Sequence, residues 1–380
     1  MMPKILLIAD SDALWTKRAV EYLLLPAGYE IVIFPIWGHK GQFDEYYREH
    51  GVTVYKDSHR LPVIRFIPRV RMWARIALNA RDLAKLGPFD VVHNHYLSQR
   101  DLALGQRIAR RFHARWVCTF WGSDLLRASD RSLRQMRPYL RRCDRLTACN
   151  ERMRDKIRRC LGESLYQKTR MAIWGQDGFA AIDRVLAAEG REACRAYYGI
   201  RPDTYVVSIG YSADNAQHQL EVVEALSALP KETLARMTLV LQQTYVKRDP
   251  AYMERVRQAA EALPCQTVVL RDFLDLTQTA RLRLCADLFI LAISTDAFAA
   301  SMQEYLYAGA VFLMGDWLGY PQLDELGIPI NRFHEYKELP ALVEQAMNGK
   351  LTKASDEQRA LLPSHYSWDA VRKDWLALYE

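Results

Sequence analysis

Residues 287–320 read DLFILAISTDAFAASMQEYLYAGAVFLMGDWLGY, and this stretch decides the fold. An apolar run at 288–293 ends in the polar loop 294–296. A segment with helical character follows, and a second apolar run occupies 310–314. This order predicts a strand, a loop, a helix and a second strand, which is a βαβ unit.

Two carboxylates accompany the start of the predicted helix. Asp296 lies in the loop and Glu304 about one turn into the helix. Ala300, Ser301 and Met302 lie at the helix start, where free backbone N–H groups and the helix dipole favour an anion. Both kinds of group suit a sugar nucleotide, because carboxylates accept hydrogen bonds from its hydroxyls and backbone amides donate hydrogen bonds to its phosphates. The spacing alone also fits an ordinary βαβ unit with a helix cap and a solvated glutamate.

Length and composition favour two domains without a membrane span. The 380 residues are many for one core, and half of them are apolar. The first apolar stretch is too short for a signal peptide, and no run reaches the ~18 residues of a membrane helix. We therefore expect a cytoplasmic protein. The seven cysteines lack CxxC spacing, which argues against a zinc site or a disulfide framework.

Positive charge is concentrated in one part of the chain. The net charge is +7, but residues 60–170 hold 26 Lys and Arg against 9 Asp and Glu, so they carry +17 and the remainder −10. The basic part therefore faces an anionic partner: nucleic acid, an anionic membrane or a phosphate-bearing acceptor.

Strands alternate with helices along the chain. This pattern predicts parallel sheets with crossover helices. It restarts after 179–201, so we predict two doubly wound, Rossmann-like domains facing across a cleft: an N-terminal acceptor-side domain at 1–180 and a C-terminal domain at 200–360. A terminal helix at 361–380 is expected to pack back on the first domain.

Candidate ligand-binding residues follow the predicted strands. Ligands of open α/β sheets bind outside the carboxyl ends of the strands. The residues at such ends are Ser11, Asp12, the 93–95 segment HNH, the turn 122–124, Gly210, Tyr211, Ser212, Thr244, Tyr245 and Asp296.

Several segments together resemble the GT-B-fold retaining glycosyltransferases of glycosyltransferase family 4. They are DVVHNH at 90–95, TFWGSDL at 119–125 with Trp121 where the family often has His, CDRLTACNERMRDKI at 143–157, TDAFAASMQE at 295–304 and SWDAVRKDWLALY at 367–379. The resemblance implies transfer of a sugar from a nucleotide-sugar donor without a bound metal or other cofactor. It also implies retention of configuration.

The resemblance also assigns roles to residues. It places Asp296, in the first position of the two-carboxylate motif, on the donor-sugar hydroxyls, Glu304 on the ribose hydroxyls and His95 near the reacting centre. We expect His93 to point to the opposite side of its strand as a packed core histidine. Ser11, Asp12, Trp121 and Asp124 are acceptor-side candidates, although Asp124 fits a helix-capping role equally well.

The loop GYSADNAQHQ at 210–219 departs from the family. Tyr211 stands where an Arg usually binds the diphosphate, and Gln217 stands where a Lys does. The loop is similar to that of enterobacterial common-antigen fucosaminyltransferases. Neutral donors from Ser212, Asn215 and His218, with backbone amides near Gly210, are therefore expected at the diphosphate, and Tyr245 completes the predicted donor site.

A basic, amphipathic segment at 59–83 favours an anionic membrane surface. It interleaves Arg65, Arg69, Arg71 and Arg75 with apolar residues that include Trp73. A solvated arginine-rich helix face is the alternative. Nucleic acid is not favoured, since no binding motif or stacking platform occurs.

These features predict a glycosyltransferase that acts on a lipid-linked or polysaccharide acceptor at the inner face of the plasma membrane. A non-hydrolysing sugar-nucleotide epimerase of the same architecture is one alternative. A non-catalytic nucleotide-sugar-binding subunit is another.

Overall fold

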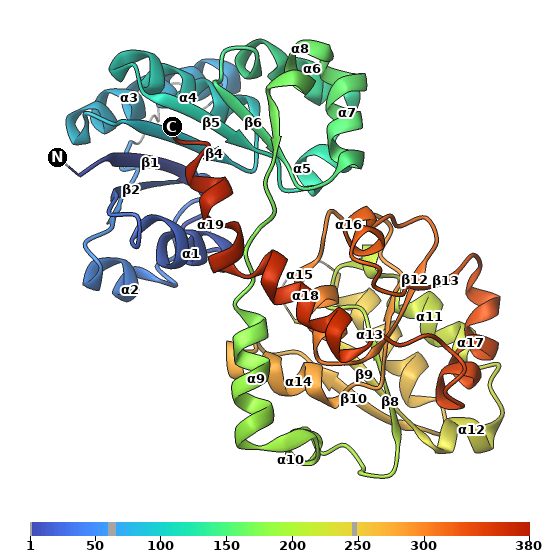
Figure 1. Cartoon of the computed structure of the whole chain (residues 1–380). Helices are drawn as coiled ribbons and strands as arrows, with labels where there is room; N and C mark the ends of the chain where they lie inside the picture. The colour runs from blue at the N-terminus through green and yellow to red at the C-terminus, as the bar shows by residue number, and fades with distance from the viewer. Residues whose placement is uncertain (1, 60–65, 245–248) are drawn as a thin grey trace. The chain divides into compact units, whose positions relative to one another are not determined.

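The computed structural model describes residues 2–59, 66–244 and 249–380. It contains two compact units, labelled by element in Figure 1: unit 1, Met1–Gly175 with Trp368–Glu380, and unit 2, Gln176–Ser367. In the described part of the chain, no helix combines the length and apolarity that a membrane crossing requires. All seven cysteines are free thiols.

Unit 1 is built on a seven-stranded parallel sheet of order β3-β2-β1-β4-β5-β6-β7. Its strands are β1 (Lys4–Ala9), β2 (Glu30–Pro35), β3 (Thr53–Val54), β4 (Val91–His95), β5 (Arg115–Thr119), β6 (Arg145–Ala148) and β7 (Thr169–Met171). The helices are α1 (Leu14–Ala19), continued by the π-helical η1 (Val20–Leu24), α2 (Asp44–Glu49), α3 (Pro68–Leu86), α4 (Gln99–Phe112), α5 (Ser123–Leu126), α6 (Asp130–Leu140), α7 (Glu151–Leu161), α8 (Glu163–Lys168) and α19 (Trp368–Leu376).

Unit 2 contains a six-stranded parallel sheet of order β10-β9-β8-β11-β12-β13. Its strands are β8 (Tyr205–Ile209), β9 (Met237–Gln242), β10 (Gln266–Leu270), β11 (Leu288–Leu291), β12 (Val311–Gly315) and β13 (Asn331–Phe333). Its helices are α9 (Gly178–Ala188), α10 (Gly190–Tyr197), η2 (Asn215–Gln217), α11 (Gln219–Leu226), α12 (Lys231–Ala235), α13 (Pro250–Glu261), α14 (Leu276–Cys285), α15 (Ala300–Tyr307), α16 (Pro321–Glu325), η3 (Tyr336–Glu338), α17 (Leu339–Met347) and α18 (Asp356–Tyr366).

The predicted fold class, two Rossmann-like parallel sheets, is confirmed. The central strands are continuous apolar runs because both faces of each sheet are covered, as in β11, where all four residues are buried. In each sheet the strand order reverses beside the first strand, between β1 and β4 in unit 1 and between β8 and β11 in unit 2. Such switch points are where doubly wound folds bind ligands.

The units divide at points that differ from the predicted boundaries. The segment 179–201, expected as the connection, forms helices α9 and α10 of unit 2, where Ile182, Val185 and Cys194 belong to a buried cluster with α14. The terminal segment 361–380 is also divided, because α18 belongs to unit 2 and α19 to unit 1. In unit 1, Trp368 and Trp375 pack against Trp174 at ring-centroid distances of 4.9 and 5.0 Å.

Candidate functional site

The loop after β11 brings Asp296 to the start of α15. One carboxylate oxygen accepts a hydrogen bond from the Ala299 N–H at 2.7 Å and another from the Tyr320 hydroxyl at 2.8 Å. The Tyr211 hydroxyl donates to the other oxygen at 3.3 Å. Burial raises the pKa of Asp296, although these hydrogen bonds act to lower it. The loop after β8, the start of α15 and the loop after β12 thus meet at this carboxylate.

Glu304 lies within α15 and is almost fully buried. Its side chain forms an ion pair with Arg283 of α14, at 2.9 Å between Nε and Oε2, with 3% and 5% of the two side chains exposed. A Cβ atom added to Gly178 would lie 2.4 Å from Glu304 Oε1, so only glycine fits at that position of α9. Glu304 was predicted to bind ribose hydroxyls, but in the structure one of its oxygens is bound to Arg283.

Sequence reasoning missed Arg283. Besides Glu304, its guanidinium donates to Gln242 Oε1 at 3.0 Å and to Ser301 Oγ at 3.1 Å. It also lies 4.4 Å from the centroid of the Tyr305 ring. A cation in the apolar stretch LRLC of α14 was the available signal. Arg283 thereby places a buried positive charge against the first turn of α15.

The loop that follows β8 makes its polar contacts within unit 2. Gly210 has a positive φ of 63°, and Gln217 Oε1 accepts from the Tyr211 N–H at 3.2 Å. Ser212 Oγ lies 3.4 Å from the Asp214 N–H, Asn215 donates to Asp249 at 3.2 Å, and His218 Nδ1 lies 3.2 Å from Glu221. Asn215 and His218 therefore contact acidic side chains of unit 2, whereas Ser212 Oγ acts as an acceptor. Tyr245, also predicted here, lies outside the described residues.

His95 ends β4 in unit 1, and His93 lies on the same side of that strand. The two imidazole centroids are 3.9 Å apart. The expectation that His93 points to the opposite side was wrong, because residues two apart in a strand share a face. Asn94 takes the opposite face, where its Oδ1 accepts from Trp116 Nε1 at 2.8 Å.

A chain of hydrogen bonds assigns the imidazole proton of His95. Trp121 Nε1–H can only donate, so His95 Nδ1 accepts, at 3.3 Å. His95 then carries its proton on Nε2, which lies 3.1 Å from His93 Nδ1. The Tyr379 hydroxyl lies 2.9 Å from that same His93 nitrogen, and His93 Nε2 lies 2.7 Å from Thr119 Oγ1. Both nitrogens of His95 therefore have a partner.

Aromatic rings enclose His95. Trp15 stacks on it at a centroid distance of 5.5 Å, and Trp121 and Trp174 lie at 5.8 and 6.0 Å. Burial lowers the pKa of His95 to about 3. Burial and the neighbouring His95 lower the pKa of His93 well below its usual range. Both imidazoles are therefore neutral near pH 7, and His95 is suited to hydrogen bonding rather than to carrying a positive charge.

The other acceptor-side candidates have partners within unit 1: Asp12 and Asp124 accept from backbone N–H groups, and Ser11 contacts the His39 side chain. The Asp12 carboxylate accepts from the N–H groups of Lys40 and Gln42 at 2.6 and 2.8 Å, and Ser11 Oγ lies 2.9 Å from His39 Nδ1. Asp124 accepts three N–H bonds, from Leu97 at 2.8 Å, Trp121 at 2.7 Å and Gly122 at 3.1 Å. These bonds join the loops after β4 and β5. They do not cap α5, because its N-cap residue is Gly122 and no side chain caps its first turn, so the capping alternative for Asp124 does not hold. Burial nevertheless raises the pKa of Asp124 to about 7.

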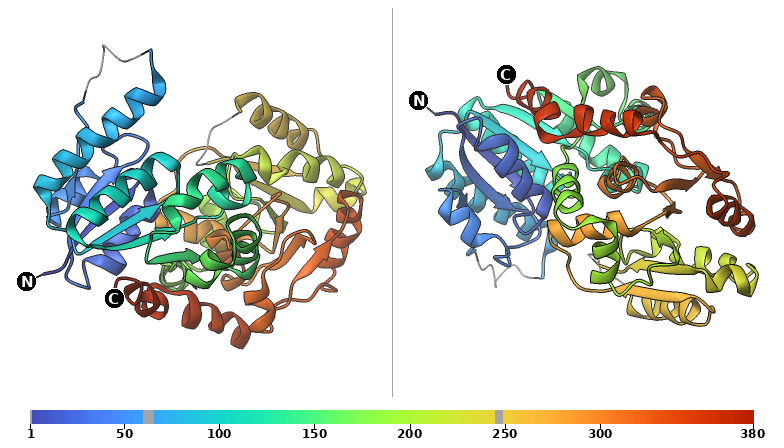
Figure 2. Two further views of the ribbon diagram at one scale, coloured as in Figure 1. Left: turned by 90° about the horizontal axis from the view of Figure 1, so that it is seen from above. Right: turned by 60° about the horizontal axis from the view of Figure 1, so that its bottom comes forward.

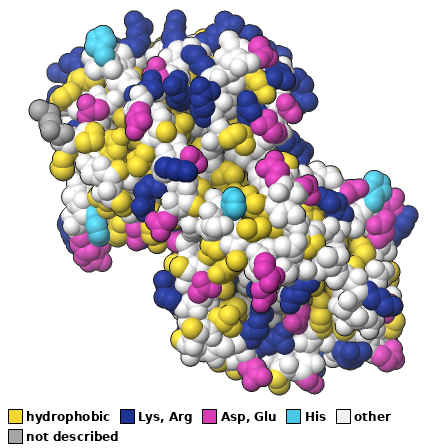
Figure 3. Space-filling view, viewed as in Figure 1, with side chains coloured by type: hydrophobic (Ala, Val, Ile, Leu, Met, Phe, Trp, Pro, Cys, Tyr) yellow, Lys and Arg dark blue, Asp and Glu magenta, His cyan; other side chains and the backbone are white. Residues whose placement is uncertain are grey.

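The predicted basic surface lies along α3. Its N-terminal end extends away from the sheet of unit 1 in the left view of Figure 2. Phe66, Ile67, Val70 and Trp73 are 77%, 53%, 49% and 44% exposed. Figure 3 shows Lys and Arg side chains gathered over the part of unit 1 that carries α3, α4, α6 and α8. Arg65 lies outside the described residues, whereas Arg69, Arg71 and Arg75 are on α3.

One family model matches part of unit 1. Residues 21–173 match the family model described as a glycosyl transferase 4-like domain. The glycosyltransferase domain predicted from the sequence is therefore present in unit 1. No curated protein matches the chain by sequence.

Solved structures match along both units. HepE of Anabaena, in complex with UDP and glucose, is 15% identical with a TM-score of 0.73, covering 99% of each chain. A glycosyltransferase from Rickettsia africae is 13% identical with a TM-score of 0.77, covering 100% of this chain and 98% of its own. The fold is GT-B. Sucrose-phosphate synthase of Thermosynechococcus elongatus shares it at 13% identity and a TM-score of 0.70, with 100% and 98% covered.

Proposed function

We propose that this protein is a retaining, metal-independent glycosyltransferase that moves a sugar from a nucleotide-sugar donor to a lipid-linked or polysaccharide acceptor. The observation that supports this most is the meeting of Asp296, the first turn of α15 and the Gly210 loop beside the switch point of unit 2. The HepE structures with UDP and with UDP-glucose give the donor class support from a protein of the same fold.

The proposed reaction exchanges one bond at the anomeric carbon. The bond from C1 of the sugar to the diphosphate oxygen breaks, and a bond from the acceptor hydroxyl oxygen to C1 forms on the same face. The acceptor proton leaves with the nucleoside diphosphate. The free N–H groups at the start of α15 stabilise the departing diphosphate, and Arg283 adds positive charge behind Ser301.

Asp296 and Glu304 are proposed to bind hydroxyl groups of the donor. Asp296 binds the hydroxyls of the sugar, which replace the Tyr211 and Tyr320 hydroxyls as its hydrogen-bond donors. Glu304 takes those of the ribose, while Arg283 holds its carboxylate in place. His95 is proposed to meet the reacting sugar, which requires exchange of the Trp121 bond to its Nδ1 for a sugar hydroxyl.

The acceptor side is proposed to work at the cytoplasmic face of the plasma membrane. The exposed apolar residues at the N-terminal end of α3 enter the interface, and Arg69 and Arg71 contact anionic headgroups. This location suits a lipid-linked acceptor in the synthesis of a surface polysaccharide or glycan.

A transfer assay tests the proposal. The purified chain is incubated with radiolabelled nucleotide sugars, including UDP-hexoses and amino-deoxyhexose nucleotides because of the likeness of the Gly210 loop to fucosaminyltransferases, and with a bacterial lipid extract. We expect label to enter the lipid fraction with the donor's anomeric configuration and in the presence of EDTA. Epimerised donor would favour the epimerase alternative, and binding without turnover would favour the non-catalytic subunit. Inverted product would contradict retention.

A further inference from the structure

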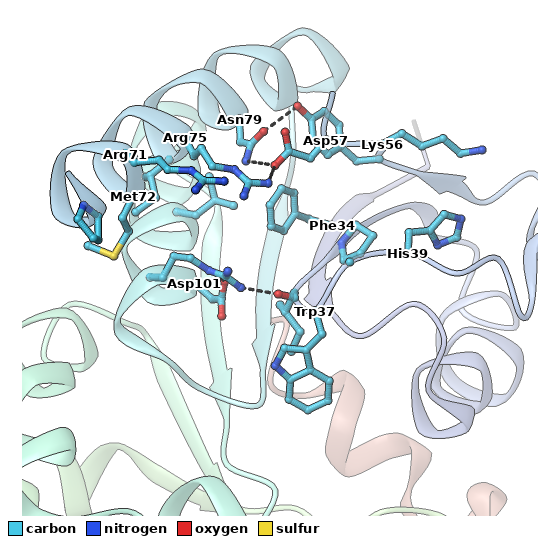
Figure 4. Close-up of a pocket in the computed structure, with 18 residues that line it drawn as sticks. Phe34, Trp37, His39, Lys56, Asp57, Arg71, Met72, Arg75, Asn79 and Asp101 are labelled. Atoms are coloured by element: carbon cyan, nitrogen blue, oxygen red, sulfur yellow. Dashed lines mark hydrogen bonds and ion pairs between the residues drawn. The ribbon is translucent and has the colours of Figure 1, made fainter. Parts of the chain in front are cut away.

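A second pocket lies wholly within unit 1. It has a volume of about 880 Å³ and opens at the carboxyl end of β2, below the N-terminal half of α3. One wall is apolar and aromatic, with Phe34, Trp37, Met72 and Ile76. Figure 4 shows these walls with Arg71 and Arg75 extending from α3 into the space. The pocket therefore combines an apolar wall with cations, which suits an amphiphilic ligand.

The cations in this pocket outnumber the acids. Among the residues that the structure describes, four Lys and Arg side chains line it against the two carboxylates of Asp57 and Asp101. Arg75 donates to Asp57, and Arg100 donates to Asp101 at 2.9 Å. In Arg71, the backbone N–H is bonded to the Ile67 carbonyl, but the guanidinium has no hydrogen-bond or ion-pair partner among the described residues. Its guanidinium is therefore available to an anion from outside the chain.

The pocket is held in shape by a polar network on its α3 side. Asn79 donates to the Asp57 carboxylate at 3.2 Å, and the Tyr55 hydroxyl donates to Asn79 Oδ1 at 3.0 Å. This network fixes Arg75 next to Arg71 (Figure 4). Two adjacent guanidinium groups, one free and one oriented, match the several oxygens of a phosphate or diphosphate.

The surroundings of the pocket point to a lipid acceptor. Trp37 packs at 4.6 Å against Tyr96, the residue that follows His95, so the pocket adjoins the predicted reacting centre of unit 1. At the N-terminal end of α3, Val70 and Trp73 of the helix and Phe66 and Ile67 just before it are exposed to solvent. An amphiphile bound in this pocket would lie between α3 and the carboxyl end of β2.

We infer that this pocket binds the phosphate-bearing head of an amphiphilic acceptor, with Arg71 and Arg75 on the phosphate oxygens and the aromatic wall against the adjoining carbon chain. The inference rests on the proposed function, because it names the acceptor class of that reaction.

Calorimetric titration of the full chain, without vesicles or nucleotide, tests the inference. Octyl diphosphate is the probe, and inorganic diphosphate and octyl glucoside are compared with it. We expect octyl diphosphate to bind at least 10-fold more tightly than either, since each comparison compound lacks one half of the chemistry. Arg71→Gln should weaken its binding about 10-fold or more. Arg81→Gln, an exposed arginine of α3 that does not line the pocket, should leave it unchanged.

Three results would overturn the inference: no binding of octyl diphosphate, equal binding of inorganic diphosphate, or an Arg71→Gln variant that melts and binds like the wild type. A parallel titration with UDP and UDP-glucose separates this inference from the proposed function. If the nucleotides bind and octyl diphosphate does not, the acceptor inference fails alone. If octyl diphosphate binds and no nucleotide or nucleotide sugar does, the donor proposal fails instead.

Discussion

At the scale of single residues, the Arg283–Glu304 pair contains one residue that sequence spacing predicted, Glu304, and one that it did not, Arg283. The eight-residue separation of Asp296 and Glu304 marked both as candidates, and both lie in one loop–helix segment, Asp296 in the loop after β11 and Glu304 in α15. Arg283 comes from a different helix, and although its place in an apolar stretch marks it as unusual, its approach to Glu304 and Ser301 is a tertiary contact that the sequence does not specify. The partners of Ser212, Asn215 and His218 were unpredictable for the same reason.

Removing one member of this buried pair should destabilise the protein. Arg283→Met leaves the Glu304 carboxylate buried without its cation, which costs about 3–5 kcal/mol. The double variant Arg283→Met/Glu304→Met should recover most of that loss, since no unpaired charge remains. Scanning calorimetry on the three proteins measures this. A double variant as unstable as Arg283→Met, or a single variant as stable as the wild type, would show that the pair is not energetically coupled.

The low pKa of His95 predicts a stability change with pH. Its folded value of about 3 lies below the ~6.5 of an unfolded histidine, so the unfolded state binds more protons between these values. The free energy of unfolding should therefore fall as the pH falls from 6.5 toward 3, by about 3 kcal/mol at pH 4.5 from this group. Asp124, with its pKa raised to about 7, acts in the opposite direction between about pH 4 and 7.

The difference between wild type and His95→Gln isolates the histidine contribution. Urea unfolding followed by tryptophan fluorescence reports on unit 1, which holds eight of the nine tryptophans. We expect His95→Gln to lose less stability than the wild type between pH 7.5 and 4.5. The exposed His113, replaced by Asn, serves as the control. Equal pH dependence in wild type and His95→Gln would contradict the assignment of a neutral, buried imidazole.

At the scale of elements, hydrophobic patterning predicted most of the sheets, because buried parallel strands are continuous apolar runs. It did not predict that 179–201 would form α9 and α10 of unit 2, since the burial of Ile182 and Val185 depends on α14. It also joined α18 and α19 into one terminal helix. The basic, amphipathic character of α3 was evident from sequence, but the pocket beneath it was not, because Phe34, Tyr55 and Asp57 come from other elements.

Helix α3 should carry the membrane affinity of the chain. Phe66→Ala/Trp73→Ala removes two exposed aromatic rings, each worth about 1.5–3 kcal/mol when buried in an apolar phase, so binding to anionic vesicles should weaken at least 10-fold. Vesicle flotation at low and high salt measures this. Leu186→Ala, an exposed apolar residue of unit 2, is the matched control. Binding that is unchanged in the aromatic variant, or absent in the wild type at low salt, would remove α3 from this role.

At the scale of the whole molecule, the chain has two Rossmann-like units with a GT-B fold, and the family model covers only part of it, residues 21–173 in unit 1. The proposed donor site lies in unit 2, so the central claim depends on whether that unit binds a nucleotide sugar through α15. The Gly210 loop differs from the family pattern, because Tyr211 and Gln217 stand where the family usually has Arg and Lys. Nucleotide-sugar binding by unit 2 therefore calls for a direct test.

Hydrogen–deuterium exchange of the full chain, with and without saturating UDP-glucose or another nucleotide sugar that binds, tests this claim most directly. The account predicts slower exchange at 210–219 and 294–307, because the ligand covers the backbone amides there. It also predicts that Glu304→Gln weakens nucleotide binding about 10- to 100-fold through loss of charge-assisted hydrogen bonds, whereas the exposed Glu224→Gln does not. Binding that protects neither segment, or no binding by any nucleotide sugar tested, would contradict the account.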